Sequence, residues 1–172
     1  MKGGIIVEQK FASQSIVLKT VLRLTNASII AISVLMVVVT LAQVIFRYII
    51  SAPLPWSEEL ARYCFVWIVF LGGAVGLSRG IHLGVDLIVN MLPEKARRGL
   101  DALTTALIAV FAGTVIYASY PVINMNMFQR SPALGVQMSW IYMAIPVSMG
   151  LILLICAERL IAYARSTNMS ED

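Results

Sequence analysis

The sequence predicts an all-α integral membrane protein with four transmembrane helices and a short amphipathic interfacial helix between the second and the third. Of the 172 residues, 59% are hydrophobic and only 13% are charged, and the mean hydropathy is +0.86. A soluble domain carries about 25% charged residues. The charged residues are also separated by long uncharged runs. The lengths of these runs are close to the length of a helix that crosses a bilayer core, about 20 residues. These observations exclude an ordinary soluble protein and a disordered chain.

Four uncharged runs define the predicted membrane spans. Three of them are long enough without further assumptions: Leu24–Phe46, Ala102–Gln129 and Ser131–Ala157. The remaining run, Tyr63–Ser78, belongs to the second span along the chain. It becomes long enough if its helix begins near Glu58 and Arg62 extends to the interface. We expect a single membrane domain of residues 1–172 with these spans: 25–46, 58–78, 102–122 and 138–158.

The distribution of Lys and Arg predicts the orientation of the chain. Ten of these residues lie at the termini or between the second and third spans: Lys2, Lys10, Lys19, Arg23, Arg79, Lys95, Arg97, Arg98, Arg159 and Arg165. Three lie on the other side of the predicted membrane: Arg47, Arg62 and Arg130. Because cytoplasmic loops are enriched in Lys and Arg, we expect both termini in the cytoplasm and the first span to be a retained anchor. This topology explains the net charge of +4 without a nucleic-acid partner.

The segment 79–92 predicts the amphipathic interfacial helix. His82, Asp86 and Asn90 recur every four positions, which gives one polar stripe on an otherwise apolar helix. Such a helix lies in the membrane interface or against neighbouring helices. The alternative is a metal or proton-relay pair formed by His82 and Asp86, but two ligands are too few for a metal site. We therefore expect a structural segment and no metal.

The loop before the second span holds candidate interaction residues. Ser57 is a candidate N-cap, and Glu58 and Glu59 lie in the first helical turn, where the helix dipole favours acids. Capping alone does not require Trp56 beside two prolines. The alternative is that Trp56, Glu58 and Glu59 form a docking edge at the outer membrane surface.

Small residues at four-residue spacing predict close helix packing. Gly72 and Gly76 form a GxxxG pair in the second span, and Ala109 and Gly113 have the same spacing in the third. We expect close helix contacts at these positions, either within the chain or against a partner. Pro146 is expected to kink the fourth span.

The predicted spans lack the groups that chemistry in a membrane requires. No ionisable side chain lies deep in a span, although transport and proton-relay sites usually depend on one. The chain has no GxSxG, HExxH or P-loop motif, and its single histidine cannot form a bis-histidine haem site. We expect no enzyme, no cofactor, no catalytic residue and no substrate ligand. A small drug-efflux protein would have a membrane-embedded Glu, and a four-span disulfide-forming enzyme would have two cysteine pairs.

The run from Gln43 to Pro93 resembles the small membrane subunit of tripartite ATP-independent periplasmic (TRAP) transporters. The resemblance extends over about residues 24–160. It is carried by these motifs: Phe46-Arg47-Tyr48, Pro55-Trp56-Ser57-Glu58-Glu59, Arg62, Phe70-Leu71-Gly72, Arg79-Gly80-x-His82-x-Gly84-Val85-Asp86 and the stretch Ser131–Val147.

The resemblance implies a role that composition does not reveal. In this family, a periplasmic binding protein captures a carboxylate-bearing solute, and a large multi-span membrane subunit carries the substrate and sodium sites. The small subunit packs against the large one in the bacterial inner membrane, in contact with lipid, and contributes to the surface where the binding protein docks. The resemblance implies these outer-surface or intersubunit candidates: Arg47, Trp56, Glu58, Glu59 and Arg62.

Two other functions are compatible with four apolar spans. One is a self-sufficient homo-oligomeric channel or carrier for a small solute. A pore of this kind should show polar residues along one face of a span, and only Thr40 and Gln43 approach that pattern. The other is an assembly or anchoring protein of a different complex.

Overall fold

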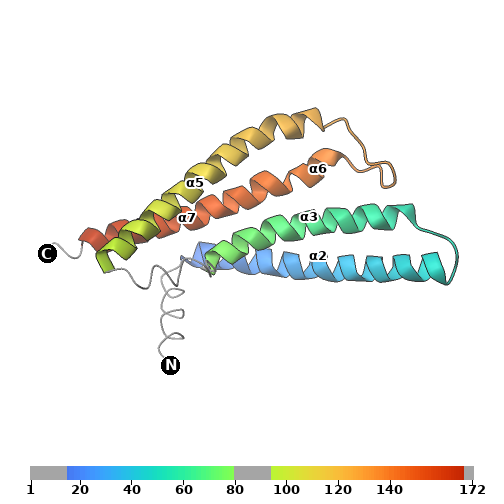
Figure 1. Cartoon of the computed structure of the whole chain (residues 1–172), viewed down its shortest axis with the longest axis horizontal. Helices are drawn as coiled ribbons and strands as arrows, with labels where there is room; N and C mark the ends of the chain where they lie inside the picture. Colours follow the sequence, from blue (N-terminus) through green and yellow to red (C-terminus); the bar gives the residue numbers. More distant parts are fainter. Residues whose placement is uncertain (1–14, 80–93, 169–172) are drawn as a thin grey trace, which may run out of the picture.

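The computed structural model describes residues 15–79 and 94–168, which form helices joined by short connections (Figure 1). In chain order the helices are α2 (Ile16–Tyr48), α3 (Pro55–Ser78), α5 (Glu94–Met125), α6 (Met138–Tyr142) and α7 (Ala144–Asn168). Within the described ranges, four stretches are long and apolar enough to cross a membrane: Ile16–Tyr48, Pro55–Ser78, Gly99–Met125 and Met138–Ile161. This confirms the predicted class of a four-span helical membrane protein. The predicted amphipathic helix, with His82, Asp86 and Asn90, lies outside the described residues.

Helix α2 begins well before the predicted start at residue 25. Ser15 is its N-cap, and the Ser15 hydroxyl accepts a hydrogen bond from the Leu18 N–H at 3.2 Å. Lys19 and Arg23 lie on exposed positions, so their charges do not interrupt the helix. On the opposite side, Leu18 and Leu22 are buried in the main hydrophobic cluster. The apolar face of this first segment therefore extends the helix beyond the uncharged run.

Helix α3 begins at Pro55, and the prediction that Ser57 is its N-cap is wrong. The N-cap position is Leu54, which supplies no side-chain cap. Proline at the first helical position already has the required φ, and its missing N–H costs nothing there. Ser57 instead lies inside the first turn, where it is completely buried and its hydroxyl donates to the Leu54 carbonyl at 2.7 Å.

Two prolines modify the second half of the chain. Helix α5 continues through Pro121 to Met125, beyond the predicted end at residue 122. The predicted fourth span is divided at Met143 into α6 and α7. Pro146 lacks the N–H that would bond to the carbonyl four residues earlier, so a helix break at this point is expected. The interruption is local, because Met143 keeps a helical backbone, its N–H donates to the Ser139 carbonyl at 2.9 Å, and its carbonyl accepts the Val147 N–H at 3.2 Å.

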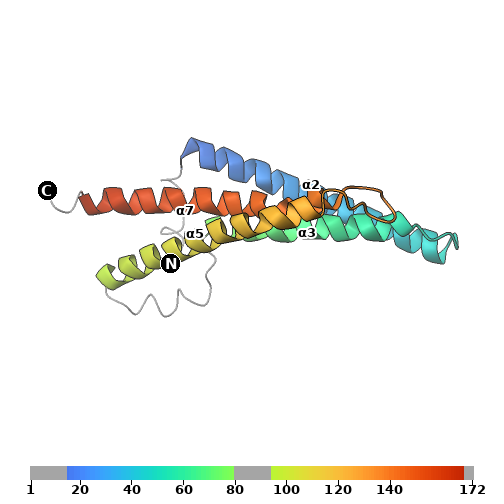
Figure 2. The same ribbon diagram turned by 90° about the horizontal axis from the view of Figure 1, so that it is seen from above.

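The helices form a layer rather than a closed bundle. Extensive contacts join α2 to α3, α3 to α7 and α7 to α5, and no comparable contact joins α2 to α5 in the described ranges. Figure 1 shows the same order across the molecule, and Figure 2 shows that the layer is twisted. The edge helices bury little: 6% of the most apolar window of α2 and 11% of that of α5, against 22% for α3 and 33% for the fourth span.

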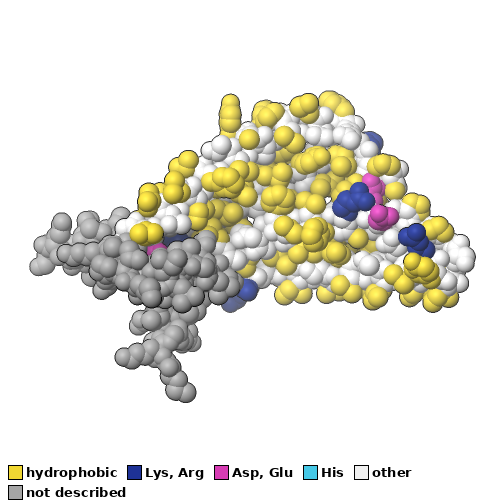
Figure 3. Space-filling view, viewed as in Figure 1, with side chains coloured by type: hydrophobic (Ala, Val, Ile, Leu, Met, Phe, Trp, Pro, Cys, Tyr) yellow, Lys and Arg dark blue, Asp and Glu magenta, His cyan; other side chains and the backbone are white. Residues whose placement is uncertain are grey.

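The main hydrophobic cluster lies where α2 begins and α3 ends. It consists of buried aliphatic residues from three helices: Leu18, Leu22, Ala74, Val75, Leu151 and Ile155. Elsewhere large apolar side chains remain exposed, and hydrophobic atoms cover much of the face in Figure 3. An apolar surface of this size is stable when lipid or another membrane protein covers it.

Candidate functional site

The connection between α5 and α6 is an ordered turn, which we call the outer turn (residues 126–137). The Ser131 N–H donates to the Val136 carbonyl at 2.9 Å, and the Gly135 N–H donates to the Ser131 carbonyl at 3.0 Å. Arg130 and Gln137 pair as an isolated antiparallel bridge. Gly135 has a φ of +67°, a conformation that glycine adopts without strain. The outer turn therefore closes on itself through its own backbone.

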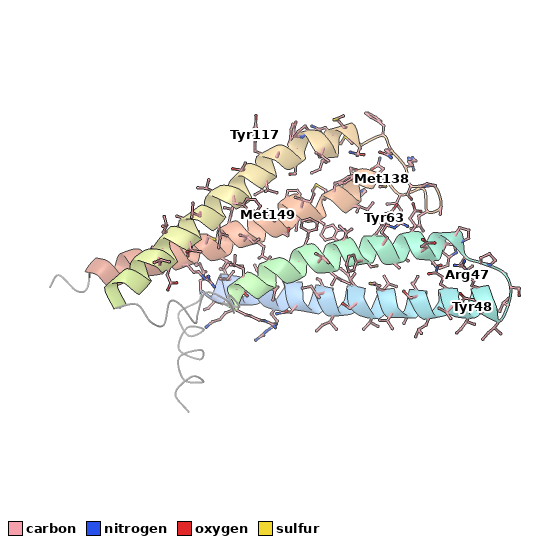
Figure 4. The ribbon with its side chains drawn as sticks, viewed as in Figure 1. Arg47, Tyr48, Tyr63, Tyr117, Met138 and Met149 are labelled. Atoms are coloured by element: carbon pink, nitrogen blue, oxygen red, sulfur yellow. The ribbon has the colours of Figure 1, made fainter. Side chains whose placement is uncertain are left out.

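Glu59 of α3 binds the tip of the outer turn. One carboxylate oxygen, Oε2, accepts the backbone N–H groups of Ala133 at 3.1 Å and Leu134 at 2.9 Å. The other oxygen, Oε1, accepts the Tyr63 hydroxyl at 2.7 Å. The Tyr63 hydroxyl oxygen also lies 3.4 Å from Sδ of Met138, and Figure 4 shows both side chains between α3 and α6. Both oxygens of the Glu59 carboxylate are thus used within the chain.

The other predicted interaction residues remain exposed. Glu58 and Arg62 form an ion pair of 3.4 Å on the surface of α3, with 66% and 68% of their side-chain areas exposed. Such a pair contributes at most about 1 kcal/mol to stability. Trp56 is 39% exposed, and Arg47 is exposed at the end of α2 (Figure 4). These four residues lie toward the same end of the layer as the outer turn, and they are free to contact a partner.

A second set of polar contacts joins the helices at the opposite end of the layer. The Arg159 guanidinium of α7 donates through Nη2 to the Leu77 carbonyl at 2.6 Å and to the Ser78 carbonyl at 3.5 Å. The Ser15 hydroxyl and backbone N–H both donate to the Glu158 carboxylate. Sequence reasoning did not identify these contacts, because their partners are far apart in the sequence and no local spacing relates them.

The predicted packing glycines do not lie at close helix contacts within the chain. A Cβ atom added at Gly72, Gly76 or Gly113 would have nothing within 4 Å, and Ala109 is only half-buried. Other small residues occupy the tightest positions and are completely buried: Ala74, Ala112, Ala144 and Ser148. Ala144 and Ser148 lie four residues apart, so the same small-residue spacing could have identified them in the fourth span, whereas no such pair links Ala74 and Ala112.

An apolar groove lies between α2, α3 and α7. It has a volume of about 530 Å³, and its walls include Leu24, Ile32, Trp67 and Leu71. None of its lining side chains is ionisable, and Thr25 and Ser28 contribute its polar groups. In the part of the chain that the structure describes, no three His, Cys, Asp or Glu side chains come close enough to hold a metal ion. Long-range side-chain hydrogen bonds of the described residues gather at two places: the start of α3 with the outer turn, and the end of α3 with α7.

This arrangement defines a multi-pass helical membrane protein whose polar side chains join its helices and its outer turn. The sequence matches the family model described as "Tripartite ATP-independent periplasmic transporters, DctQ component" over residues 36–166. The match covers more than half of the chain, and the chain therefore belongs to this family, as the sequence motifs predicted.

Curated relatives agree with this assignment. The sialic acid TRAP transporter small permease protein SiaQ of Vibrio cholerae is 33% identical over 101 residues, which are 59% of this chain and 58% of SiaQ. The C4-dicarboxylate TRAP transporter small permease protein DctQ of Rhodobacter capsulatus is 31% identical over 120 residues, 66% of this chain and 51% of DctQ. The sialic acid TRAP transporter permease protein SiaT of Haemophilus influenzae is 31% identical over 109 residues, 63% of this chain but only 18% of SiaT.

Proposed function

We propose that the chain is the small scaffold subunit of a TRAP-type secondary transporter in a bacterial inner membrane, with both termini in the cytoplasm. It packs against a large multi-span membrane subunit. The assembled transporter imports an organic acid that a periplasmic binding protein delivers, and sodium drives the import. The observation that carries this proposal is the match to the family model over residues 36–166. The groove between the helices has no charged side chain, which agrees with a scaffold role.

The open layer supports a partner that is itself a membrane protein. Helix α3 has neighbours on both sides, yet Phe65 and Val69 are 55% and 51% exposed along one stripe of its surface. Gly72 and Gly76 continue this stripe at helical spacing, with nothing within 4 Å of an added Cβ. Glycines permit close helix approach in membranes, so we place a helix of the large subunit on this stripe.

The relatives support the partner, and those named for a solute are named for organic anions, the sulfonate isethionate among them. SiaT carries a segment similar to this chain within a much longer permease polypeptide. In SiaT, a segment similar to this chain is therefore part of the same polypeptide as a longer permease sequence. SiaQ and DctQ are named for sialic acid and C4-dicarboxylate, and both solutes carry carboxylate groups. An imported carboxylate is the corresponding proposal for this chain.

Gentle affinity purification from the native membrane, followed by mass spectrometry, tests the proposal. We expect one large membrane protein in about equal amount with this chain. A homo-oligomer without a partner would contradict the scaffold role and favour the channel or carrier. Uptake in reconstituted vesicles gives a second test, because full uptake by the large subunit and binding protein alone would also contradict the proposal.

A further inference from the structure

The backbone N–H groups at the tip of the outer turn find their hydrogen-bond acceptor outside the turn, on α3. The turn closes through Ser131, Gly135 and Val136, and the N–H groups of Ala133 and Leu134 donate to the Glu59 carboxylate instead. Two successive backbone N–H groups that converge on one anionic oxygen form charge-assisted hydrogen bonds, which are about twice as strong as neutral ones. The carboxylate therefore determines where the tip lies relative to α3.

Comparison with the adjacent residue separates this role from helix capping. Glu58 and Glu59 both lie in the first turns of α3, where the helix dipole favours either carboxylate. Glu58 is exposed, and among the described residues its carboxylate pairs with Arg62, four residues along the same helix. Glu59 bonds to groups 74 and 75 residues away in the sequence. The helix dipole explains the acidic character of both positions, but it does not explain the long-range contacts of Glu59.

The position of this contact in the layer gives it mechanical importance. Toward the end of α3, the α3–α7 contact is held by Val75, Ile155 and the Arg159 hydrogen bonds. Toward the start of α3, among the described residues, Glu59 and Tyr63 make the side-chain hydrogen bonds that link α3 to the outer turn and α6. Loss of the Glu59 carboxylate would free the outer turn from the start of α3. The contact between α7 and the end of α3 would remain, because Arg159 still holds it.

We propose that Glu59 is a positioning residue that fixes the outer turn beside the start of α3. Val136 of the outer turn and Trp140 of α6 are exposed, and they are thereby held at the end of the layer where α3 begins with the exposed Trp56. We assign the surface that carries these side chains to docking of the binding protein. This inference rests on the proposed function, because the surface is assigned to docking of the binding protein. A preformed surface lowers the ordering cost of association, so Glu59 acts on docking and leaves the transport step unchanged.

Spin-label distances test the positioning directly. Labels are placed at Phe65→Cys and Val136→Cys, both exposed, in a full-length chain whose buried Cys64 and Cys156 are replaced by alanine. In lipid nanodiscs we expect one narrow distance distribution with Glu59 present and a broad or shifted one for Glu59→Ala.

Two further variants sharpen this measurement. Glu58→Ala removes the adjacent carboxylate and should leave the distribution narrow. Glu59→Gln retains an acceptor oxygen without the charge and should give an intermediate width, which keeps the test valid if the alanine variant does not fold. A narrow, unshifted distribution in both Glu59 variants would overturn the proposal.

Uptake by reconstituted vesicles tests the consequence for docking. The binding protein is titrated, with radiolabelled succinate and sialic acid as probe solutes. We expect Glu59→Ala to raise the half-saturating concentration of binding protein about tenfold, which corresponds to about 1.4 kcal/mol, with the maximal rate unchanged. A lower maximal rate at an unchanged half-saturating concentration would refute the docking role. Uptake that does not depend on this chain at all would refute the proposed function, while the spin-label result would still decide the positioning role.

Discussion

Arg159 offers the sharpest test of how the layer is held together. The last turn of α3 contains no basic residue, and the C-terminal carbonyls of a helix carry partial negative charge without an intrahelical partner. The guanidinium of the C-cap residue Arg79 donates to the Asn26 side chain of α2 at 3.2 Å, whereas Arg159 of α7 donates to the carbonyls of Leu77 and Ser78. Replacing Arg159 by methionine retains most of the aliphatic chain and removes only the guanidinium.

The expected loss follows from these contacts. A hydrogen bond to a charged group contributes about 1.5–3 kcal/mol, and the bond to Leu77, at 2.6 Å, is the strong one. The bond to Ser78, at 3.5 Å, is at the limit of hydrogen-bond geometry and adds little. We therefore expect Arg159→Met to lower the free energy of unfolding by about 2 kcal/mol, which is about thirtyfold in the unfolding equilibrium. For a chain of this size, the midpoint of thermal unfolding falls by about 4–8 °C.

Thermal unfolding in detergent micelles, followed by tryptophan fluorescence, measures this loss. Arg159→Lys retains the positive charge without the planar guanidinium and should lose about half as much. Arg23→Met is the matched control, because Arg23 is exposed and makes no side-chain hydrogen bond in the described part of the chain. Its expected change is below about 0.5 kcal/mol. If Arg159→Met unfolds at the same temperature as Arg23→Met, the reasoning is refuted.

Three further predictions concern packing and docking. Ala112→Leu places extra methyl groups at a completely buried position of α5, so thermal unfolding should show a loss of about 1–3 kcal/mol. Gly72→Ala with Gly76→Ala should not destabilise the isolated chain, because alanine favours a helix by up to about 1 kcal/mol per site and the added Cβ atoms meet nothing. The same variant should retain less of the large subunit on purification, and undiminished retention would contradict the assignment of this stripe. Trp56→Ala with Glu58→Ala should reduce uptake at limiting binding protein while the chain still inserts into the membrane, whereas full uptake would argue against docking at this edge.

The sequence predicted the number and approximate positions of the spans, because uncharged runs and helix length are local properties. The predicted end of the second span at residue 78 coincides with the end of α3, but the start of α2 was not predicted. Helix α2 begins at Ile16 because Ser15 caps it and Leu18 is buried against other helices. The burial of Leu18 depends on residues of α3 and α7, which no local pattern of the first span contains.

The sequence indicated which residues could form an interaction surface at the start of α3. It did not indicate which of them make contacts within the chain and which remain exposed. Glu58 and Glu59 are identical in type and adjacent in sequence, and both suited a docking edge or a helix start. Only the fold shows that Glu59 faces the outer turn while Glu58 faces solvent. Similarly, the spacing of Gly72 and Gly76 indicated a packing surface, but which residues lie between helices depends on how each helix is rotated in the layer.

The order of helices across the layer determines how motion passes through this protein. Because the contacts run in series from α2 to α3, α7 and α5, a displacement of one edge helix reaches the other edge through the contact between α3 and α7. The hydrogen bonds of Arg159 join α7 to the end of α3, while those of Glu59 join the start of α3 to the outer turn, which leads into α6. A membrane partner on one edge helix is therefore coupled to the other edge through the α3–α7 contact, and a substitution in that contact should affect both edges.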